Sequence, residues 1–232
     1  MLATSWAGSA TSLADHANQA AADALVDEIQ QAGGTAMAVR HDLCDPVSIR
    51  DAVESVVRAW GGLDVLVACA WVSPGWAAPD HQPEATPAEA WQTQLRANVE
   101  GTAYTVQAVL PHMRSGGWGR IVLISSGAAE DGSGGLEQYG AAKAALHGLS
   151  RGLARSGGPA GILTNVVMPG LVATERHRQT IPPQVLEHVA QQTPTRRLAS
   201  EDDVARLAVF LASAANGSVN GSEVRVSGGL RM

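Results

Sequence analysis

The sequence predicts an α/β fold, a doubly wound parallel sheet with helices packed on both of its faces. Short apolar runs alternate with longer segments in which apolar residues recur at helical spacing. The run 63–69 is mostly apolar, as strands buried on both faces are. A chain of 232 residues suits one domain, and no internal repeat divides it, so residues 1–232 are predicted to form a single domain.

The first half of the chain is expected to alternate between strands and helices. Asp45 is a good N-cap residue, and Pro46 suits the first helical position, so a helix is predicted from there to about residue 60. Residues 86–89 have the capping-box pattern and predict the start of a long helix that ends near Met113. Residues 7–12 are small and predict a loop. The other elements expected here are strands at 1–6, 35–39 and 63–69 and a helix at 19–32, which stops at two glycines.

The second half continues the same alternation. Ser200 precedes three acidic residues and predicts the cap of a last helix. A loop with a short helix is expected over 171–193, covering the carboxyl ends of the strands. The remaining elements are predicted to be strands at 119–125, 161–167 and 223–226 and helices at 138–155 and 200–213.

Residues 120–145 carry the candidate chemistry of the chain. The strand at 119–125 leads directly into Ser126, and the next helix holds Tyr139 and Lys143 four residues apart, on one face. A hydroxyl, a phenol and an ammonium group gathered in this way form an acid/base site. Lys143 is the single lysine beside 15 arginines, so this position is predicted to need an ammonium group in particular.

Composition excludes several classes of partner. The net charge is −6 and no basic run occurs, so neither nucleic acid nor a membrane surface is an expected partner. No apolar run reaches the length of a membrane span. Two cysteines, Cys44 and Cys69, are too few for a disulfide framework, and a cytoplasmic protein is predicted.

From about Ala20 to its end, the chain resembles the short-chain dehydrogenases/reductases, and in style the 3-oxoacyl-carrier-protein reductases. Ser126 precedes Tyr139 by 13 positions, and Tyr139 begins the family's Tyr-x-x-x-Lys motif. The resemblance implies a Rossmann-like fold, shortened at its N-terminus. The other matching pieces, in the family's order, are the run 61–67, Asn98, Pro169-Gly170 with Thr174, and Ser227-Gly228-Gly229.

The resemblance implies a role for each of these residues. Tyr139 would be the general acid/base, Lys143 would lower the pKa of its phenol, and Ser126 would hydrogen-bond the substrate oxygen. Asn98 would hold a water that links Lys143 to solvent. The implied cofactor is NAD(P)H, with NADP slightly favoured. Its binding residues would be Asp42, Leu43, Ala70, Tyr139, Lys143, Pro169, Gly170 and Thr174.

The chain departs from the family at the cofactor end. The strand, Gly-rich phosphate loop and helix with which the family begins are missing, a loss of about 25 residues. The family's Asn-Asn-Ala-Gly is Ala68-Cys69-Ala70-Trp71 here, and an indole in place of the glycine would crowd the cofactor ribose. Either residues 1–6 enter or adjoin the central place of the lost strand, or this chain starts downstream of its natural start.

Two functions remain open at this point, with a third much less favoured. The first is an oxidoreductase that reduces a ketone or oxidises an alcohol of a small molecule, in polyketide or other secondary metabolism. The alternative is a cofactor-independent enzyme on the same fold, resembling a halohydrin dehalogenase, cyclase, dehydratase or isomerase and using Ser126 and Tyr139. The third is a non-catalytic partner of a complete reductase. By analogy with the family, the helices at 87–113 and 138–155 are expected to pair in a homodimer or homotetramer.

Overall fold

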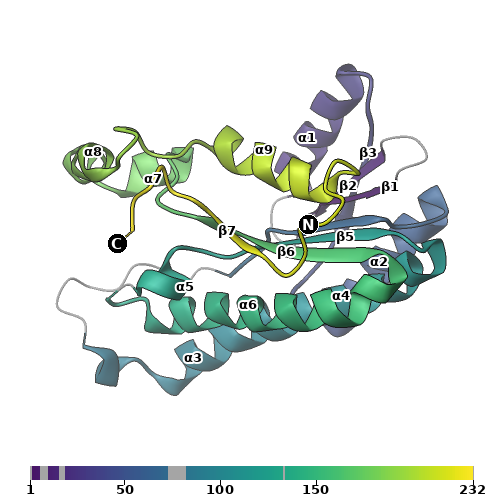
Figure 1. Cartoon of the computed structure of the whole chain (residues 1–232), viewed down its shortest axis with the longest axis horizontal. Coiled ribbons are helices and arrows are strands. Elements are labelled where there is room, and N and C mark those ends of the chain that lie inside the picture. Colours follow the sequence, from purple (N-terminus) through teal and green to yellow (C-terminus); the bar gives the residue numbers. More distant parts are fainter. Residues whose placement is uncertain (1, 6–9, 16–18, 73–81, 133, 232) are drawn as a thin grey trace.

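In the computed structural model, the chain is described over residues 2–5, 10–15, 19–72, 82–132 and 134–231. It forms a seven-stranded sheet with the order β3-β2-β1-β4-β5-β6-β7 and helices on both faces. Helices α1 and α9 lie on one face, and α4 and α6 lie on the other (Figure 1). The predicted α/β class with a doubly wound sheet is confirmed.

Six of the seven strands run in the predicted parallel arrangement, from β2–β3 on one side to β4–β7 on the other. The predicted strands at 35–39, 63–69, 119–125, 161–167 and 223–226 are present with small shifts of their ends. The strands are β1 Leu2–Ser5, β2 Ala10–Asp15, β3 Thr35–Arg40, β4 Val65–Ala68, β5 Gly119–Ile124, β6 Ile162–Pro169 and β7 Glu223–Val226.

Strand β1 takes the central place between β2 and β4, as predicted for residues 1–6, but it runs antiparallel to both neighbours. Its direction follows from the chain length that joins it to β2. Only residues 6–9 separate the two strands, and so short a connection joins antiparallel strands, whereas parallel neighbours need a crossover of a dozen or more residues. The loop predicted at 7–12 is wrong from residue 10 onwards, because β2 begins there.

The helices confirm most of the predicted boundaries. Asp45 caps α2 by accepting a hydrogen bond from the Val47 amide at 2.9 Å. Ser200 and Asp203 form a capping box at α9. The helices are α1 Gln19–Gln31, α2 Pro46–Trp60, α3 Ala88–Leu95, α4 Gly101–Gly116, α5 Ala128–Asp131, α6 Glu137–Gly157, α7 Glu175–Thr180, α8 Pro183–Gln192 and α9 Glu201–Ala212.

The long helix predicted from residue 86 differs at its start and in its middle. The Thr86 amide donates to the Pro83 carbonyl and closes a preceding 3₁₀ turn, Pro83–Ala85, so Pro87 becomes the N-cap of α3. The capping box predicted at 86–89 is therefore wrong. One π-helical turn, Arg96–Glu100, joins α3 to α4. Such turns widen the helix locally and occur often at functional sites.

The core lies between the sheet and the helices on the α4 and α6 face. Strands β5 and β6 supply fully buried side chains such as Ile121, Leu123 and Val166, and α4 contributes Val109 and Met113. This packing holds the helices against the sheet and so positions them relative to the carboxyl ends of the strands. None of the described helices is long and apolar enough to cross a membrane.

Candidate active site

Three of the four predicted catalytic residues meet just beyond the carboxyl end of β5. Ser126 follows that strand, and α6 presents Tyr139 and Lys143 from the same face. The Ser126 side chain interacts with the Tyr139 phenol and acts to lower its pKa. The Lys143 Nζ donates to the Ile124 carbonyl at 2.8 Å and lies 5.9 Å from the centre of the Tyr139 ring. The structure therefore brings together the hydroxyl, phenol and ammonium groups that the sequence predicted.

The short helix α5 holds the Ser126 side chain from the other direction. The Ala128 amide donates to the Ser126 Oγ at 3.3 Å, at the start of α5. Arg225 on β7 binds α5 through Asp131 and through Glu130, the latter at 2.7 Å. A single helical turn is not stable alone, so these ion pairs help to fix the loop that carries the serine.

Burial determines the pKa of Tyr139. Removal of the phenol from water disfavours the phenolate and raises its pKa above the ordinary value of 10.0, while the interaction with Ser126 acts in the opposite direction. The sequence predicted that Lys143 would lower this pKa. The net shift of the pKa is upward because desolvation is the largest effect, and the lowering by Lys143 stays a prediction.

Lys143 is almost fully enclosed, with 4% of its surface exposed. Burial lowers the pKa of its ammonium group to about 8, because the charged form loses its hydration. The Nζ lies 5.8 Å from the centre of the Trp71 ring and receives some compensation from the two aromatic faces around it. The single lysine of the chain is thus a buried, easily deprotonated group.

This pKa predicts that stability depends on pH. In the native protein the Lys143 ammonium loses its proton near pH 8, whereas in the unfolded chain it does so near 10.5. The unfolded chain binds more protons between these values, so native stability rises with pH there. Relative to a Lys143→Met variant, the wild type should gain roughly 2 kcal/mol between pH 7 and pH 9.5 in urea unfolding. A difference between the two proteins that stays constant over this range would contradict the prediction.

The fourth predicted residue, Asn98, lies in the π-helical turn and binds the segment after β4. Its Oδ1 accepts from the Val72 amide at 2.8 Å, and its Nδ2 donates to the Val72 carbonyl at 3.1 Å and to the Gln94 Oε1 at 2.8 Å. The side chain therefore fixes the backbone next to Trp71. The predicted role in holding a water for Lys143 stays a prediction.

Removal of the Asn98 amide should destabilise the protein. An Asn98→Ala variant loses three hydrogen bonds and leaves the buried Gln94 carbonyl without this donor, so its free energy of unfolding should fall by about 2–4 kcal/mol. Denaturant unfolding measures this change. The exposed amide variant Gln179→Ala is the control and should change stability by less than about 0.5 kcal/mol. Equal effects in the two variants would show that the Val72 contacts do not stabilise the fold.

Trp71 packs directly against the acid/base pair. Its ring centre lies 4.9 Å from that of Tyr139, with the two planes at 48°. The sequence placed this indole where the family has glycine and predicted that it crowds the cofactor ribose. Its contacts with Tyr139 and Lys143 agree with that position.

The residues predicted to hold the nicotinamide end of a cofactor surround the same site. Pro169 ends β6, and its carbonyl accepts from the Gly127 amide at 2.9 Å, beside Ser126. The Gly170 amide donates to the Val226 carbonyl at 2.9 Å. Thr174 caps α7 by accepting from the His177 amide at 3.1 Å. Their part in holding the nicotinamide end, with Tyr139 and Lys143, stays a prediction.

The described residues fit the adenosine and phosphate ends of the cofactor less well. Asp42 accepts from the Cys44 amide at 2.9 Å, and Leu43 and Ala70 line one cavity of only about 10 Å³, the room of a single water. No helix lies between β1 and β2 in the described chain, since only residues 6–9 join them. The helix N-terminus that binds the cofactor pyrophosphate in this kind of fold is therefore not supplied there.

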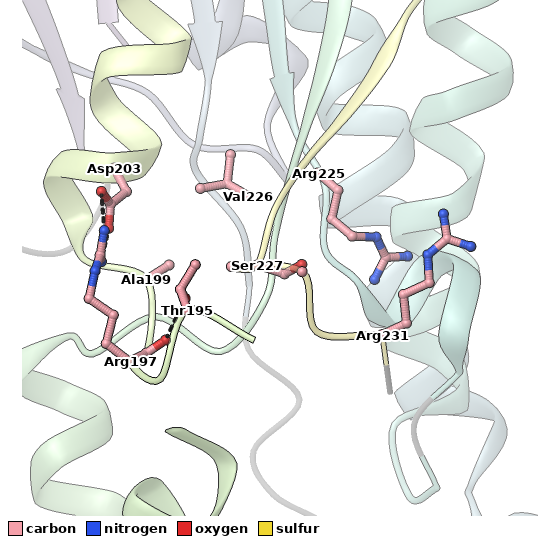
Figure 2. Close-up of a pocket in the computed structure, with 10 residues that line it drawn as sticks. Thr195, Arg197, Ala199, Asp203, Arg225, Val226, Ser227 and Arg231 are labelled. Atoms are coloured by element: carbon pink, nitrogen blue, oxygen red, sulfur yellow. Dashed lines mark hydrogen bonds and ion pairs between the residues drawn. The ribbon is translucent and has the colours of Figure 1, made fainter. Parts of the chain in front are cut away.

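A larger pocket, of about 530 Å³, lies beside β7, and none of the four predicted catalytic residues lines it. Figure 2 shows Arg197 turned toward Asp203, with Arg225 and Arg231 beyond Ser227. Arg197 donates two hydrogen bonds to Asp203, at 2.5 and 3.1 Å, and Arg225 is paired with acidic residues of α5. Two of the three arginines that line the pocket are thus paired with acidic residues. Its lining residues are Thr195, Arg197, Ala199, Asp203, Arg225, Val226, Ser227, Gly228, Gly229 and Arg231.

No role was predicted for Ser125 or His147, and the structure places both next to the backbone of Lys143. The Ser125 Oγ donates to the Lys143 carbonyl at 3.1 Å and lies 2.8 Å from the His147 Nε2. The only available signal was helical spacing, because His147 follows Lys143 by four residues on the same helix. That spacing alone does not distinguish a core histidine from a functional one.

Comparison with known proteins agrees with this geometry. The family model described as Enoyl-(Acyl carrier protein) reductase matches residues 3–231. The 7alpha-hydroxysteroid dehydrogenase of Escherichia coli (strain K12) is 34% identical over 212 residues, which cover 91% of this chain and 81% of that protein. The chain belongs to the short-chain dehydrogenase/reductase family. It is therefore an oxidoreductase, and the resemblance predicted from its motifs is confirmed.

Two solved structures of other proteins, each with ligands bound, have a similar fold. A 7 alpha-hydroxysteroid dehydrogenase complexed with NADH and 7-oxo glycochenodeoxycholic acid superposes with a TM-score of 0.87 at 32% identity, covering 95% of this chain and 84% of that chain. A gluconate 5-dehydrogenase from Burkholderia cenocepacia J2315 with NADP and tartrate gives a TM-score of 0.84 at 29% identity, covering 94% and 84%. The names of these relatives favour a nicotinamide-dependent dehydrogenase, and none favours the cofactor-independent alternative.

Proposed function

We propose that this short-chain dehydrogenase/reductase interconverts a ketone and a secondary alcohol of a small molecule, with Tyr139 as the general acid/base. The observation that carries the proposal is the joined set of Ser126, Tyr139 and Lys143 at the end of β5. A bound nicotinamide cofactor supplies or accepts the hydride. Tyr139 donates or accepts the proton, and Ser126 orients the substrate oxygen.

The proton chemistry follows from burial. In the reducing direction, the protonated Tyr139 donates to the carbonyl oxygen while the Ser126 hydroxyl stabilises the negative charge that develops on that oxygen. The raised pKa keeps the phenol protonated at neutral pH, which suits reduction. In the oxidising direction Tyr139 must act as a base, so that rate rises as pH increases toward the tyrosine pKa.

We infer that the cofactor's nicotinamide end is held by Tyr139, Lys143, Pro169, Gly170 and Thr174. Asp42, Leu43 and Ala70 would contact the adenosine end. Between the two forms we expect NADPH, because Arg40 is exposed at the end of β3, two residues before Asp42, and an arginine can bind the 2′-phosphate. Because no helix follows β1, binding should be weaker than in relatives that have the phosphate loop.

Titration of NADPH and NADH by fluorescence or calorimetry tests this function. We expect saturable binding of at least one of them, together with cofactor-dependent reduction in a panel of small ketones. If neither cofactor binds at millimolar concentration and Tyr139-dependent turnover occurs without cofactor, the proposal is overturned in favour of the cofactor-independent alternative. The same protein should form a homodimer or homotetramer, which light scattering after size-exclusion chromatography measures.

A further inference from the structure

A buried histidine below the active site faces two carboxylates that come from different elements. His147 lies on α6, Glu130 on α5 and Glu223 on β7, and ligand atoms of the three lie within 4.8 Å of one another. His147 is 6% exposed, whereas Glu130 reaches the surface. None of these residues has a part in the proposed ketone chemistry.

The hydrogen bonds of Ser125 are compatible with a histidine protonated on Nε2. The Ser125 hydroxyl has one proton and donates it to the Lys143 carbonyl at 3.1 Å. The Ser125 Oγ can then accept from the His147 Nε2 at 2.8 Å. In this tautomer of the neutral ring, Nε2 holds the proton and Nδ1 is left with a lone pair.

The Nδ1 lone pair faces the carboxylate of Glu223. The His147 Nδ1 lies 4.0 Å from the Glu223 Oε1, too far for a hydrogen bond. Two electron-rich atoms that face each other across this distance repel unless a proton or a cation lies between them.

Neighbouring arginines do not fully balance the acidic residues. Glu223 is paired with Arg151, and Arg225 is paired with both Glu130 and Asp131. Among these five described side chains, three carboxylates lie beside two guanidinium groups. A cation at Nδ1 would add a positive charge to this group.

We propose that His147, Glu130 and Glu223 form a binding site for a divalent transition-metal ion such as Zn²⁺. One imidazole nitrogen and two carboxylates are a ligand set that suits zinc, and Ser125 supplies the partner that a metal-bound histidine has on its other nitrogen. Tetrahedral zinc places neighbouring ligand atoms about 3.3 Å apart, so the carboxylates have to move inward by about an ångström. The exposed Glu130 side chain has the freedom to do so.

The bound ion would tie together the three elements that surround Ser126. Helix α5 begins two residues after this serine, α6 carries Tyr139, and β7 holds α5 through Arg225. Metal binding should therefore stabilise the native state, because the unfolded chain does not hold the three ligands together. The effect does not depend on any cofactor or substrate.

The test uses tag-free, chelator-treated protein with both cysteines changed to serine, so that the Cys44 and Cys69 thiols, which are exposed, do not bind the metal. Zinc is titrated by competition with a chromophoric chelator. We expect one ion per chain with a Kd below about 10 µM. The melting temperature should rise by several degrees at saturation.

Single substitutions decide whether these three side chains are the ligands. His147→Gln, Glu130→Gln and Glu223→Gln should each weaken zinc binding at least tenfold, while the exposed-residue controls His188→Gln and Glu187→Gln should bind as the parent does. Melting of each variant in the presence of chelator checks that it is folded. If the parent shows no binding below about 100 µM, or if the three variants bind as tightly as the controls, zinc is an adventitious ion only and the proposal fails.

Discussion

A Tyr139→Phe variant should lose about 10²- to 10⁴-fold in kcat, because it removes the group that gives a proton to the substrate oxygen and takes it back. Affinity for the cofactor should change little, since the ring and its contact with Trp71 are kept. Steady-state reduction of the best ketone, with a parallel cofactor titration, measures both quantities. This split between turnover and binding is what a general acid/base predicts.

The chain offers a matched control for this substitution. Tyr104, the only other tyrosine, lies on α4 with 40% of its surface exposed, and Tyr104→Phe should keep the activity of the parent. A Tyr139→Phe variant with full activity would refute the acid/base assignment. Equal losses in the two variants would show that the phenol of Tyr139 has no special part in the reaction.

Replacement of Trp71 by glycine should strengthen nicotinamide cofactor binding by at least about tenfold, which corresponds to about 1.4 kcal/mol. The indole packs 4.9 Å from the Tyr139 ring, measured between centres, and lies over the Lys143 Nζ. Tyr139 and Lys143 are two of the residues that we infer to hold the nicotinamide end of the cofactor. Glycine at this position removes the bulk and permits close approach of a ligand to the backbone.

A Trp71→Phe variant separates the bulk of the side chain from its aromatic character. It should fall between the parent and Trp71→Gly in cofactor affinity, since a smaller ring remains over Tyr139. Fluorescence titration of NADPH and NADH with all three proteins gives the comparison, and denaturant unfolding shows whether the glycine variant is still folded. A folded Trp71→Gly protein that binds cofactor no better than the parent would show that the indole does not limit binding.

Features that depend on residues close in sequence could be predicted without the structure. Tyr139 and Lys143 lie four residues apart, so any helix over 138–155 had to present them on one face. Asp45-Pro46 and the Ser200 capping box set helix starts through contacts within three residues. The alternation of apolar runs was likewise enough to predict the α/β class.

Even a local pattern failed where two signals competed for one residue. Residues 86–89 match a capping box, but Pro83 starts a 3₁₀ turn that ends on the Thr86 amide. A similar limit affected the N-terminus. Its central position could be inferred from the need to fill the sheet, whereas its direction depended on β2, a strand that the composition of residues 7–12 did not reveal.

The sequence by itself determined the family and most of the order of the elements, and it predicted the acid/base residues, since each of these depends on short motifs and local spacing. Only the tertiary structure decided their surroundings: the burial that raises the pKa of Tyr139, the contacts of Asn98 with Val72, and the meeting of His147 with Glu130 and Glu223. These contacts join residues that are tens of positions apart in the chain. Desolvation and charge depend on all the neighbours that folding brings together, and no local pattern records them.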